Sequence, residues 1–345
     1  MTDTKRLTIP AAEELLGLYF PVLDHGYVAL VDYMGGDEAI DQAARTSYGA
    51  GTRKVTERRG LMRTLKRNRH SSPYEMVEIK LHCAMPIFVA RQWVRHRMAS
   101  LNEYSARYSV MPMLFYIPDA DVLGKQSVNN KQGRGEPLEA EQFAAYLDSV
   151  HRANEAAEAE YALQITMGVA RETARGVLPV SVYTQWYWKT DLHNMFHMLG
   201  LRCDPHAQLE FQSYANIIAG IVKRIAPNSF EAWVDYEFCG ARFSRMEMNV
   251  LRKLLTHMNY FPSGDQKRPE PCALIHDGVG GGVSIDEMVE HYGMSKREIA
   301  ELFAKLFDQK NRPVPSFELD LSLTKSPEFF ADKWAAAVPK VDREK

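Results

Sequence analysis

Alternating apolar and polar residues predict a strand in the first third of the chain. Between positions 77 and 85, Val, Ile, Leu, Cys and Met occupy every second place, so one face of an extended segment would be buried. The apolar run at 27–34 predicts a second strand, which Gly35 and Gly36 end with turn residues. Pro86 then suits the first turn of a helix over 86–96.

In most other segments up to about residue 240, apolar residues recur at helical spacing. Short helices are predicted at 37–48, 56–69 and 230–238, and long ones at about 139–175, 191–200 and 205–225. The run at 113–118 predicts one more strand, and the polar stretch at 119–138 predicts a surface excursion. These elements favour an α/β protein of the α+β type, with a mixed or antiparallel sheet packed against long helices.

The character of the chain changes near residue 262. The stretches SGDQKRPEP and DGVGGG are rich in residues that break helices and strands. Between them and the C-terminus, residues 284–307 predict a helix, a turn at Gly293 and a second helix with Ser295 as N-cap. We therefore expect a catalytic domain at 1–261 and a partly helical C-terminal extension at 262–345.

Composition excludes several classes of protein. The 345 residues are 46% hydrophobic and 25% charged, which is a globular balance, and the formal net charge of −2 offers no global attraction to nucleic acid or anionic membrane. The N-terminus has no apolar signal core, and no apolar run approaches the roughly 20 residues that span a bilayer. The four cysteines form no Cys-x-x-Cys pair. We expect a reduced, cytoplasmic protein without membrane contact.

The densest group of polar residues begins within the helix predicted at 86–96. Four arginines fall within 17 positions, at Arg91, Arg95, Arg97 and Arg107. Arginine binds phosphates and planar acceptor pairs through two parallel hydrogen bonds. Such a group is also typical of a solvated, ion-paired helix end. Residue types alone leave both interpretations open.

The spacing within this group favours a specific family. Arg95-His96-Arg97, followed after seven residues by Ser105 within RQWVRHRMASLNEYSARYS, resembles the signature of the flavin-dependent thymidylate synthases. Other segments resemble further parts of that family, namely ARTSY at 44–48, HSSPYE at 70–75, ARETARGVLP at 170–179, and residues 191–202 with PHAQ at 205–208. The resemblance extends over about residues 20–240.

The resemblance implies a methyltransferase that makes dTMP from dUMP. It implies 5,10-methylenetetrahydrofolate as carbon donor, FAD as hydride carrier, NADPH as reductant and a homotetramer with shared active sites. The catalytic positions correspond to Arg202, Ser105 and His70. The dUMP positions correspond to Gln92, Arg95, Glu103, Ser105, Arg107, Tyr108, Arg175 and Arg202. The FAD positions correspond to Ser47, Ser72, His96, Arg97, Met98, Asn102, Glu103, Asp191, His193 and His197.

Three of these positions depart from the family pattern. Asp191 and His193 stand where Asn and Arg are common, and His197 where Asn or His occurs. An aspartate close to a diphosphate would be repelled, so Asp191 is expected at a ribose or ring edge, or only as a helix cap. His193 and His197 share a helix face, but no third zinc ligand or HExxH motif accompanies them. We therefore predict no metal.

Two rival functions remain open. Pro271-Cys272 superficially resembles the nucleophile motif of the cysteine-dependent thymidylate synthases, although Ala273 follows where His or Gln is expected. A nucleic-acid-binding regulator could use the helix–turn–helix-like segment or the basic stretch at 53–69. The acidic side chains of that segment's first helix, among them Asp286 and Glu290, would repel phosphate. Nucleic acid is therefore the less favoured partner.

Overall fold

Two compact units make up the chain. The computed structural model describes residues 6–47, 57–128, 131–257, 285–291, 293–294, 296–303, 305–306 and 315–339. Tyr48, Cys272, Ser295 and the glycine-rich linkers, all used above, lie outside the described residues. The first unit comprises Met1–Trp233 and Ser316–Lys345, and the second comprises Val234–Pro315. Each unit has a hydrophobic cluster of its own.

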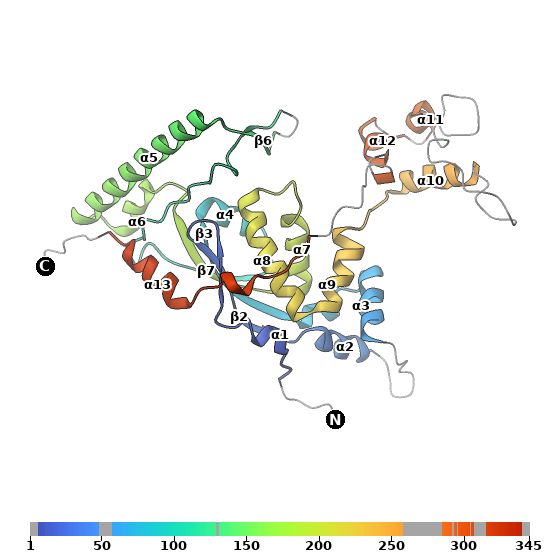
Figure 1. The fold of residues 1–345 in the computed structure, drawn as a ribbon. Helices are drawn as coiled ribbons and strands as arrows, with labels where there is room; N and C mark the ends of the chain where they lie inside the picture. The colour runs from blue at the N-terminus through green and yellow to red at the C-terminus, as the bar shows by residue number, and fades with distance from the viewer. Residues whose placement is uncertain are drawn as a thin grey trace. The chain divides into compact units, whose positions relative to one another are not determined.

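A five-stranded sheet forms the centre of the first unit (Figure 1). In spatial order its strands are β1 (Tyr19–Val22), β2 (Gly26–Met34), β3 (Glu78–Pro86), β7 (Tyr183–Asp191) and β4 (Ser100–Glu103). Every neighbouring pair is antiparallel. The expected fold class, an antiparallel sheet combined with long helices, is confirmed.

The interior strand β7 was not among the predicted elements. Its nine residues pair with all nine of β3, from Glu78 opposite Asp191 to Pro86 opposite Tyr183. Trp186 on β7 is buried, whereas its neighbour Tyr187 is exposed, so the strand does alternate. In the sequence, the buried and exposed positions of β7 differ little in hydrophobicity, because the exposed positions include an aromatic residue. The predicted strand at 113–118 instead runs as an extended segment with one isolated bridge to the residue before β7.

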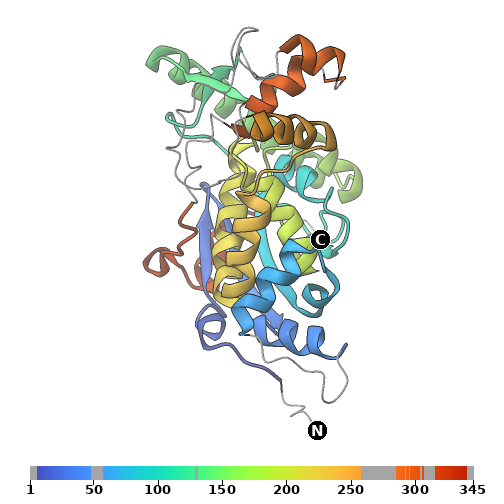
Figure 2. The ribbon, with the colours of Figure 1, turned by 90° about the vertical axis from the view of Figure 1, so that its right-hand side faces the viewer.

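Of the described helices, six beside the sheet lie close to predicted positions. They are α2 (Asp37–Arg45), α3 (Arg58–Arg67), α4 (Ile87–Trp93), α7 (Leu192–Arg202), α8 (Leu209–Ile225) and α9 (Pro227–Trp233). The short helices α1 (Pro10–Glu13) and η1 (Ser72–Met76) were not predicted. Figure 2 shows α8 in yellow running along the sheet. The hydroxyl of Tyr214 on α8 donates to the carbonyl of Ala84 at 2.8 Å. A side chain at Gly26 would collide with that hydroxyl, so the contact requires glycine.

The predicted excursion and long helix occupy the region between β4 and β7. The excursion contains a two-stranded hairpin of β5 (Gly124–Gln126) and β6 (Arg134–Pro137). The long helix is α5 (Ala140–Thr166), which begins with a capping box and is followed by α6 (Arg171–Ala174) and η2 (Arg175–Val177). Only Asn154 and Tyr161 of α5 are buried, so most of this helix faces away from the core.

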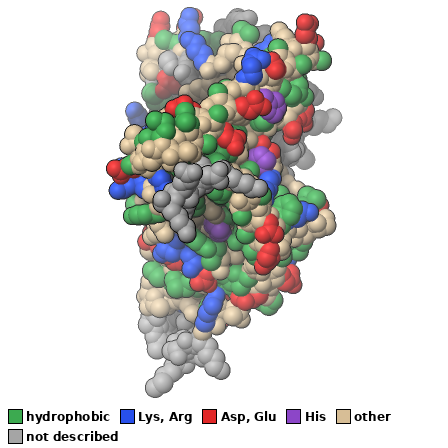
Figure 3. All heavy atoms as spheres, turned by 90° about the vertical axis from the view of Figure 1, so that its left-hand side faces the viewer, with side chains coloured by type: hydrophobic (Ala, Val, Ile, Leu, Met, Phe, Trp, Pro, Cys, Tyr) green, Lys and Arg blue, Asp and Glu red, His purple; other side chains and the backbone are tan. Residues whose placement is uncertain are grey.

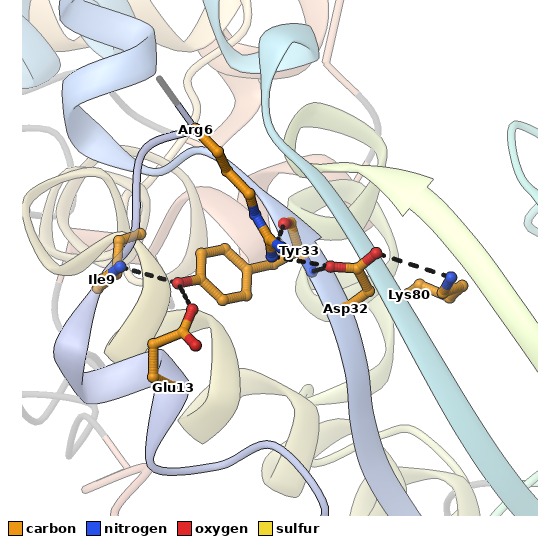
Figure 4. A network of polar contacts seen from close by, with 6 residues as sticks. All are labelled: Arg6, Ile9, Glu13, Asp32, Tyr33 and Lys80. Carbon is orange, nitrogen blue, oxygen red and sulfur yellow. Dashed lines mark hydrogen bonds and ion pairs between the residues drawn. The ribbon is translucent and has the colours of Figure 1, made fainter.

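A polar network fixes the N-terminal segment to the edge of the sheet (Figure 4). Tyr33 on β2 accepts a hydrogen bond from the backbone N–H of Ile9 at 2.8 Å and donates its own proton to Glu13. Arg6 bonds the carboxylate of Asp32 at 3.0 Å and the carbonyl of Tyr33 at 3.3 Å. Both ends of α1 are therefore held against β2.

The C-terminal part of the chain completes the core of the first unit. After η6 (Leu321–Leu323), Lys325 exchanges backbone hydrogen bonds of 2.9 and 3.1 Å with Tyr19. α13 (Pro327–Ala336) then lies on the face of the sheet opposite α8. Figure 1 shows α13 in red and α8 in yellow on opposite sides of the strands. Phe330 and Trp334 of α13 are buried in a cluster with Tyr27.

The compact units do not follow the domain boundary expected at 261/262. The chain leaves the first unit after Trp233 and rejoins it at Ser316. The rings of Trp233 and Phe317 lie 6.4 Å apart, so the two ends of the intervening segment are adjacent within the first unit. Breaker-rich linkers show where helices stop, but they do not show on which core a later apolar helix packs.

The second unit is a small helical module. It contains η3 (Val234–Phe238), α10 (Arg245–His257), α11 (Ile285–Glu290) and α12 (Lys296–Phe303). Val250 of α10 packs with residues of the other two α-helices, including Met288 and Leu302. Gly293 between α11 and α12 has φ +65°, as the predicted helix–turn–helix requires. No helix in the described parts of either unit is long and apolar enough to cross a membrane.

Replacing Phe330 with Ala should destabilise the first unit by about 3–5 kcal/mol, because the change leaves a cavity between α13 and β2. The adjacent Phe329 is 48% exposed and provides a matched control, for which F329A should cost less than about 1 kcal/mol. Urea unfolding followed by circular dichroism measures both. Equal losses for the two variants would mean that α13 does not belong to the folded core.

Candidate active site

A cavity of about 390 Å³ opens between the end of α4, β7 and α7. It is lined by Arg95, His96, Arg97, Met98, Trp188, Thr190, Asn194 and His197. Five of these eight residues were predicted as site residues from the sequence motif and the helix at 191–200. The volume lies in the lower part of the range for ligand pockets, roughly 300–1,000 Å³.

Local structure explains why these segments meet. Pairing of β4 with β7 places the segment after α4 beside Thr190, whose hydroxyl donates to the carbonyl of Met98 at 2.6 Å. α7 follows β7 without a loop, because Asp191 caps its first turn. The Asp191 carboxylate accepts from the backbone N–H of Asn194 at 2.9 Å and from its side-chain amide at 2.6 Å. Of the two roles expected for Asp191, the structure contains the helix cap.

His96 is held in one protonation state. Its Nε2 accepts a hydrogen bond of 3.1 Å from Nε of Arg202, and arginine can only donate. The imidazole is therefore neutral, with its proton on Nδ1. Burial, followed by the charges of Arg202 and His197, lowers the pKa of His96 to about 4. His96 thus offers a neutral N–H donor rather than a positive charge.

Arg202 connects α7 to α4 and α8. Its guanidinium lies 4.8 Å above the ring of Phe211 on α8, and its Nη2 donates to the carbonyl of Gln92 at 3.4 Å. Burial lowers the pKa of Arg202. The Gln92 side chain in turn donates to Oε1 of Gln208. Two residues predicted to bind dUMP, Gln92 and Arg202, are therefore in direct contact with each other, and Arg202 also contacts His96.

A second group of predicted residues lies at the other end of β4. Arg107 pairs with Glu172 at 3.3 Å, and Arg171 donates to the carbonyl of Tyr108 at 2.8 Å. Ser105 accepts from the backbone N–H of Arg107 at 3.3 Å. These contacts join the segment after β4 to α6, directly before the exposed Arg175. Of the arginines predicted for dUMP, Arg107 and Arg175 thus lie in joined segments, whereas Arg95 lines the cavity.

The edge strand β4 separates these two groups. Asn102 and Glu103 are exposed on it, and Glu103 accepts a hydrogen bond of 2.7 Å from Thr184 of β7. Four strand residues extend over roughly 13 Å, a span comparable to a nucleotide. The arrangement has a nitrogen-rich cavity at one end and exposed arginines at the other.

Several predicted residues do not line the cavity. Ser47 lies just after α2, and His70 and Ser72 lie at η1, with all three exposed. His193 is on α7 but does not line the cavity either. Conversely, the motif did not indicate Trp188, Thr190 or Asn194. The alternation within 183–191 is the signal that could have identified the first two.

Cysteine and metal chemistry find little support in the described part of the chain. Burial raises the pKa of Cys203 to about 12 and raises that of Cys83 well above its usual value, so neither is a ready thiolate. Among the described residues, no group of three or more His, Cys, Asp or Glu side chains could hold a metal ion. Cys272, the residue of the rival nucleophile motif, lies outside the described residues.

The basic stretch at 53–69 offers little to nucleic acid in its described part. Arg59 bonds the carboxylate of Glu231, and Arg63 approaches the same group at 3.4 Å. Lys66 is buried between two aromatic rings. Ion pairing and burial therefore reduce the basic surface along the described part of this stretch. On a different face of the molecule, shown in Figure 3, blue Lys and Arg side chains are interspersed with red Asp and Glu.

The side chains around the cavity fit part of a flavin nucleotide. Arg97 supplies a cationic donor for a diphosphate, and Asn194 and the neutral His96 supply uncharged hydrogen-bonding groups for a ring or a ribose. Met98 and Trp188 add apolar surface. The chemistry of this set matches FAD without requiring a metal.

Comparisons with known proteins agree with the motif. The family described as "Thymidylate synthase complementing protein" matches residues 29–228, more than half of the chain. The flavin-dependent thymidylate synthase of Ruegeria pomeroyi is 47% identical over 256 residues, covering 73% of this chain and 85% of that protein. The enzyme of the same name from Dictyostelium discoideum is 51% identical over 242 residues, covering 67% and 78%.

A solved structure shares the fold. The UMP/dUMP methylase PolB from Streptomyces cacaoi, bound with 5-Br UMP, superposes with a TM-score of 0.58 and 34% identity. The match covers 64% of this chain and 98% of PolB. Nearly all of PolB therefore corresponds to part of this chain, which has additional residues.

Replacing His96 with Gln should reduce the loss of folding stability at acid pH. In the unfolded chain His96 binds a proton below its ordinary pKa of about 6.5, whereas in the folded chain it does so only near 4, so folding stability falls as pH drops through this window. When the pH is lowered from 7 to 4.5, the urea midpoint should fall less for H96Q than for the parent. The control H151Q changes an exposed histidine on α5. Parallel falls for H96Q and the parent would contradict the prediction.

Proposed function

Because the chain belongs to the family of flavin-dependent thymidylate synthases, which methylate dUMP, we propose that it forms dTMP with FAD as hydride carrier, 5,10-methylenetetrahydrofolate as carbon donor and NADPH as reductant. The observation that carries this proposal is the cavity in which Arg95, His96 and Arg97 of the motif meet His197 of α7. Two distant segments with matching chemistry converge there.

The proposed FAD site uses the cavity and the strand beside it. Its residues in this chain are His96, Arg97, Met98, Asn102, Glu103, Asp191, His193 and His197, with Ser47 and Ser72. In this arrangement Arg97 neutralises diphosphate charge, His96 donates through Nδ1, and Asp191 acts by holding Asn194 at the cavity wall. Bound FAD would supply the hydride chemistry, and the protein supplies binding and orientation.

The proposed dUMP site lies along β4. We assign Ser105, Arg107, Tyr108 and Arg175 to the phosphate, and Gln92, Arg95, Glu103 and Arg202 to the nucleoside. Arg202 combines two properties that suit it to catalysis, a fixed position and partial burial. Its charge would stabilise negative charge that develops on the uracil ring, and it is present before the reaction begins.

A homotetramer with shared active sites would account for the predicted site residues that do not line the cavity. Ser47, Ser72 and His70 are exposed and do not line the cavity of their own chain. In a tetramer they could complete the site of a second copy, with His70 beside the flavin ring. The free thiols of Cys83 and Cys203 fit a cytoplasmic, reducing compartment.

Replacing Arg107 with Ala should weaken dUMP binding about 10- to 100-fold while FAD binding stays within about twofold. Loss of one charge-assisted contact to a phosphate costs about 1.5–3 kcal/mol. Calorimetric titration with each ligand measures both affinities. R152A, which removes an equally exposed, ion-paired arginine from α5, should change neither. A similar loss of dUMP and FAD affinity in R107A would show that this arginine does not distinguish the ligands.

The reaction itself tests the proposed function. The variant C83A/C203S/C239S/C272S should still convert dUMP to dTMP when supplied with FAD, NADPH and methylenetetrahydrofolate. Burial raises the pKa of the Cys83 and Cys203 thiols, so neither is a ready thiolate. Removal of FAD should abolish product in both the parent and this variant. A folded, flavin-loaded, cysteine-free protein that regains activity only when one cysteine is restored would indicate a thiolate mechanism.

A further inference from the structure

A chain of side-chain hydrogen bonds runs from the proposed nucleotide site into the core. The Gln92 amide nitrogen on α4 donates to Oε1 of Gln208, and Nε2 of Gln208 donates to Oε2 of Glu210 at 2.9 Å. Glu210, in the first turn of α8, is only 2% exposed. The sequence motif indicated Gln92 and Gln208 but gave no role to Glu210. We name these three residues the amide relay.

Glu210 is ionised in this position. Its Oε1 accepts from the hydroxyl of Tyr116 at 3.1 Å and from the guanidinium of Arg134. Burial alone would raise the pKa of the Glu210 carboxyl, but the hydrogen bonds and charge of Arg134, together with Gln208, lower it below its usual range. Arg134 belongs to β6 and also donates to the carbonyl of Val122 at 2.8 Å. The surface hairpin therefore supplies the counter-charge.

The ionised carboxylate determines the direction of every hydrogen bond in the amide relay. A carboxylate can only accept, so Gln208 must turn its NH₂ group toward Glu210 and its oxygen toward Gln92. Gln92 must then turn its own NH₂ group toward Gln208. No hydrogen bond to Oε1 of Gln92 occurs among the described residues, so this oxygen remains available as an acceptor.

We propose that Gln208 and Glu210 are positioning residues that hold the Gln92 amide in the single orientation in which its oxygen accepts a hydrogen bond from the bound nucleotide. This inference rests on the proposed placement of dUMP beside Gln92. The orientation is set before the ligand arrives, so binding does not have to select one of two amide rotamers. The group recognised is a donor of the nucleotide, an N–H of the base or a hydroxyl of the sugar.

Exchanging the side chains at positions 208 and 210 tests the direction of these hydrogen bonds. In E210Q the oxygen of the new amide accepts from Arg134 and Tyr116, so its NH₂ group faces Gln208. Gln208 and Gln92 are then turned the opposite way, and the dUMP Kd and KM should rise at least about tenfold with little change in kcat. In the double variant Q208E/E210Q, the new carboxylate at position 208 accepts from Gln92. The new amide at position 210 donates to that carboxylate, while its oxygen accepts from Tyr116 and Arg134. This variant restores the direction and should recover most of the dUMP affinity.

A further variant protects the test against misfolding. Q208L interrupts the amide relay without touching the contacts that Glu210 makes with Tyr116 and Arg134, and it should lose dUMP affinity as E210Q does. The control E231Q makes the same substitution in an arginine-paired carboxylate on α9 and should bind dUMP like the parent. Urea unfolding confirms that each variant is folded, and FAD titration should give unchanged affinity.

The outcomes distinguish failure of the positioning role from failure of the proposed function. Parental dUMP affinity in Q208L or E210Q, or equal losses in E210Q and Q208E/E210Q, would overturn the positioning role. A parent protein that binds no dUMP would instead overturn the proposed nucleotide site itself. Recovery in the double variant cannot come from a purely structural role of Glu210, because that variant also lacks the carboxylate at position 210.

Discussion

The pairing of β3 with β7 is the contact on which the site depends. α4 follows β3 directly and α7 follows β7 directly, so this pairing determines where both helices begin. Among the described strands, β4 pairs with β7 alone, and it brings Asn102 and Glu103 to the edge of the sheet. A slip of one residue would turn Trp188 outward and separate Thr190 from the carbonyl it binds.

Aromatic side chains packed between α4, β7 and α8 hold the candidate site in place. Trp93 is fully buried, with its ring centroid 5.4 Å from that of Trp186, 5.5 Å from Trp188 and 5.1 Å from Phe211. It thereby joins α4 to both β7 and α8. Gln92 is the residue directly before it in the chain, so its backbone has little freedom. The polar groups of the site are positioned by apolar contacts beneath them.

Strong periodicity in the sequence predicted elements well, and contiguous motifs predicted part of the site. β3 and α8 lie within a few residues of their expected positions, because their buried faces are clearly apolar. β7 escaped prediction because its buried and exposed positions both carry aromatic residues. Arg95 and His96 were predicted because the motif is continuous. Asn194 lies within the predicted segment 191–202, but only the cap by Asp191 and the packing of α7 show that its side chain, and not that of His193, lines the cavity.

The late position of α13 in the chain has a consequence for synthesis on the ribosome. Phe330 and Trp334 complete the core around Tyr27, yet they are translated roughly 300 residues later, which takes about 15–60 s at ordinary elongation rates. During that time one face of β2 lacks its cover. The nascent chain therefore presents apolar surface that chaperones recognise, and the first unit reaches its final packing only when α13 leaves the exit tunnel.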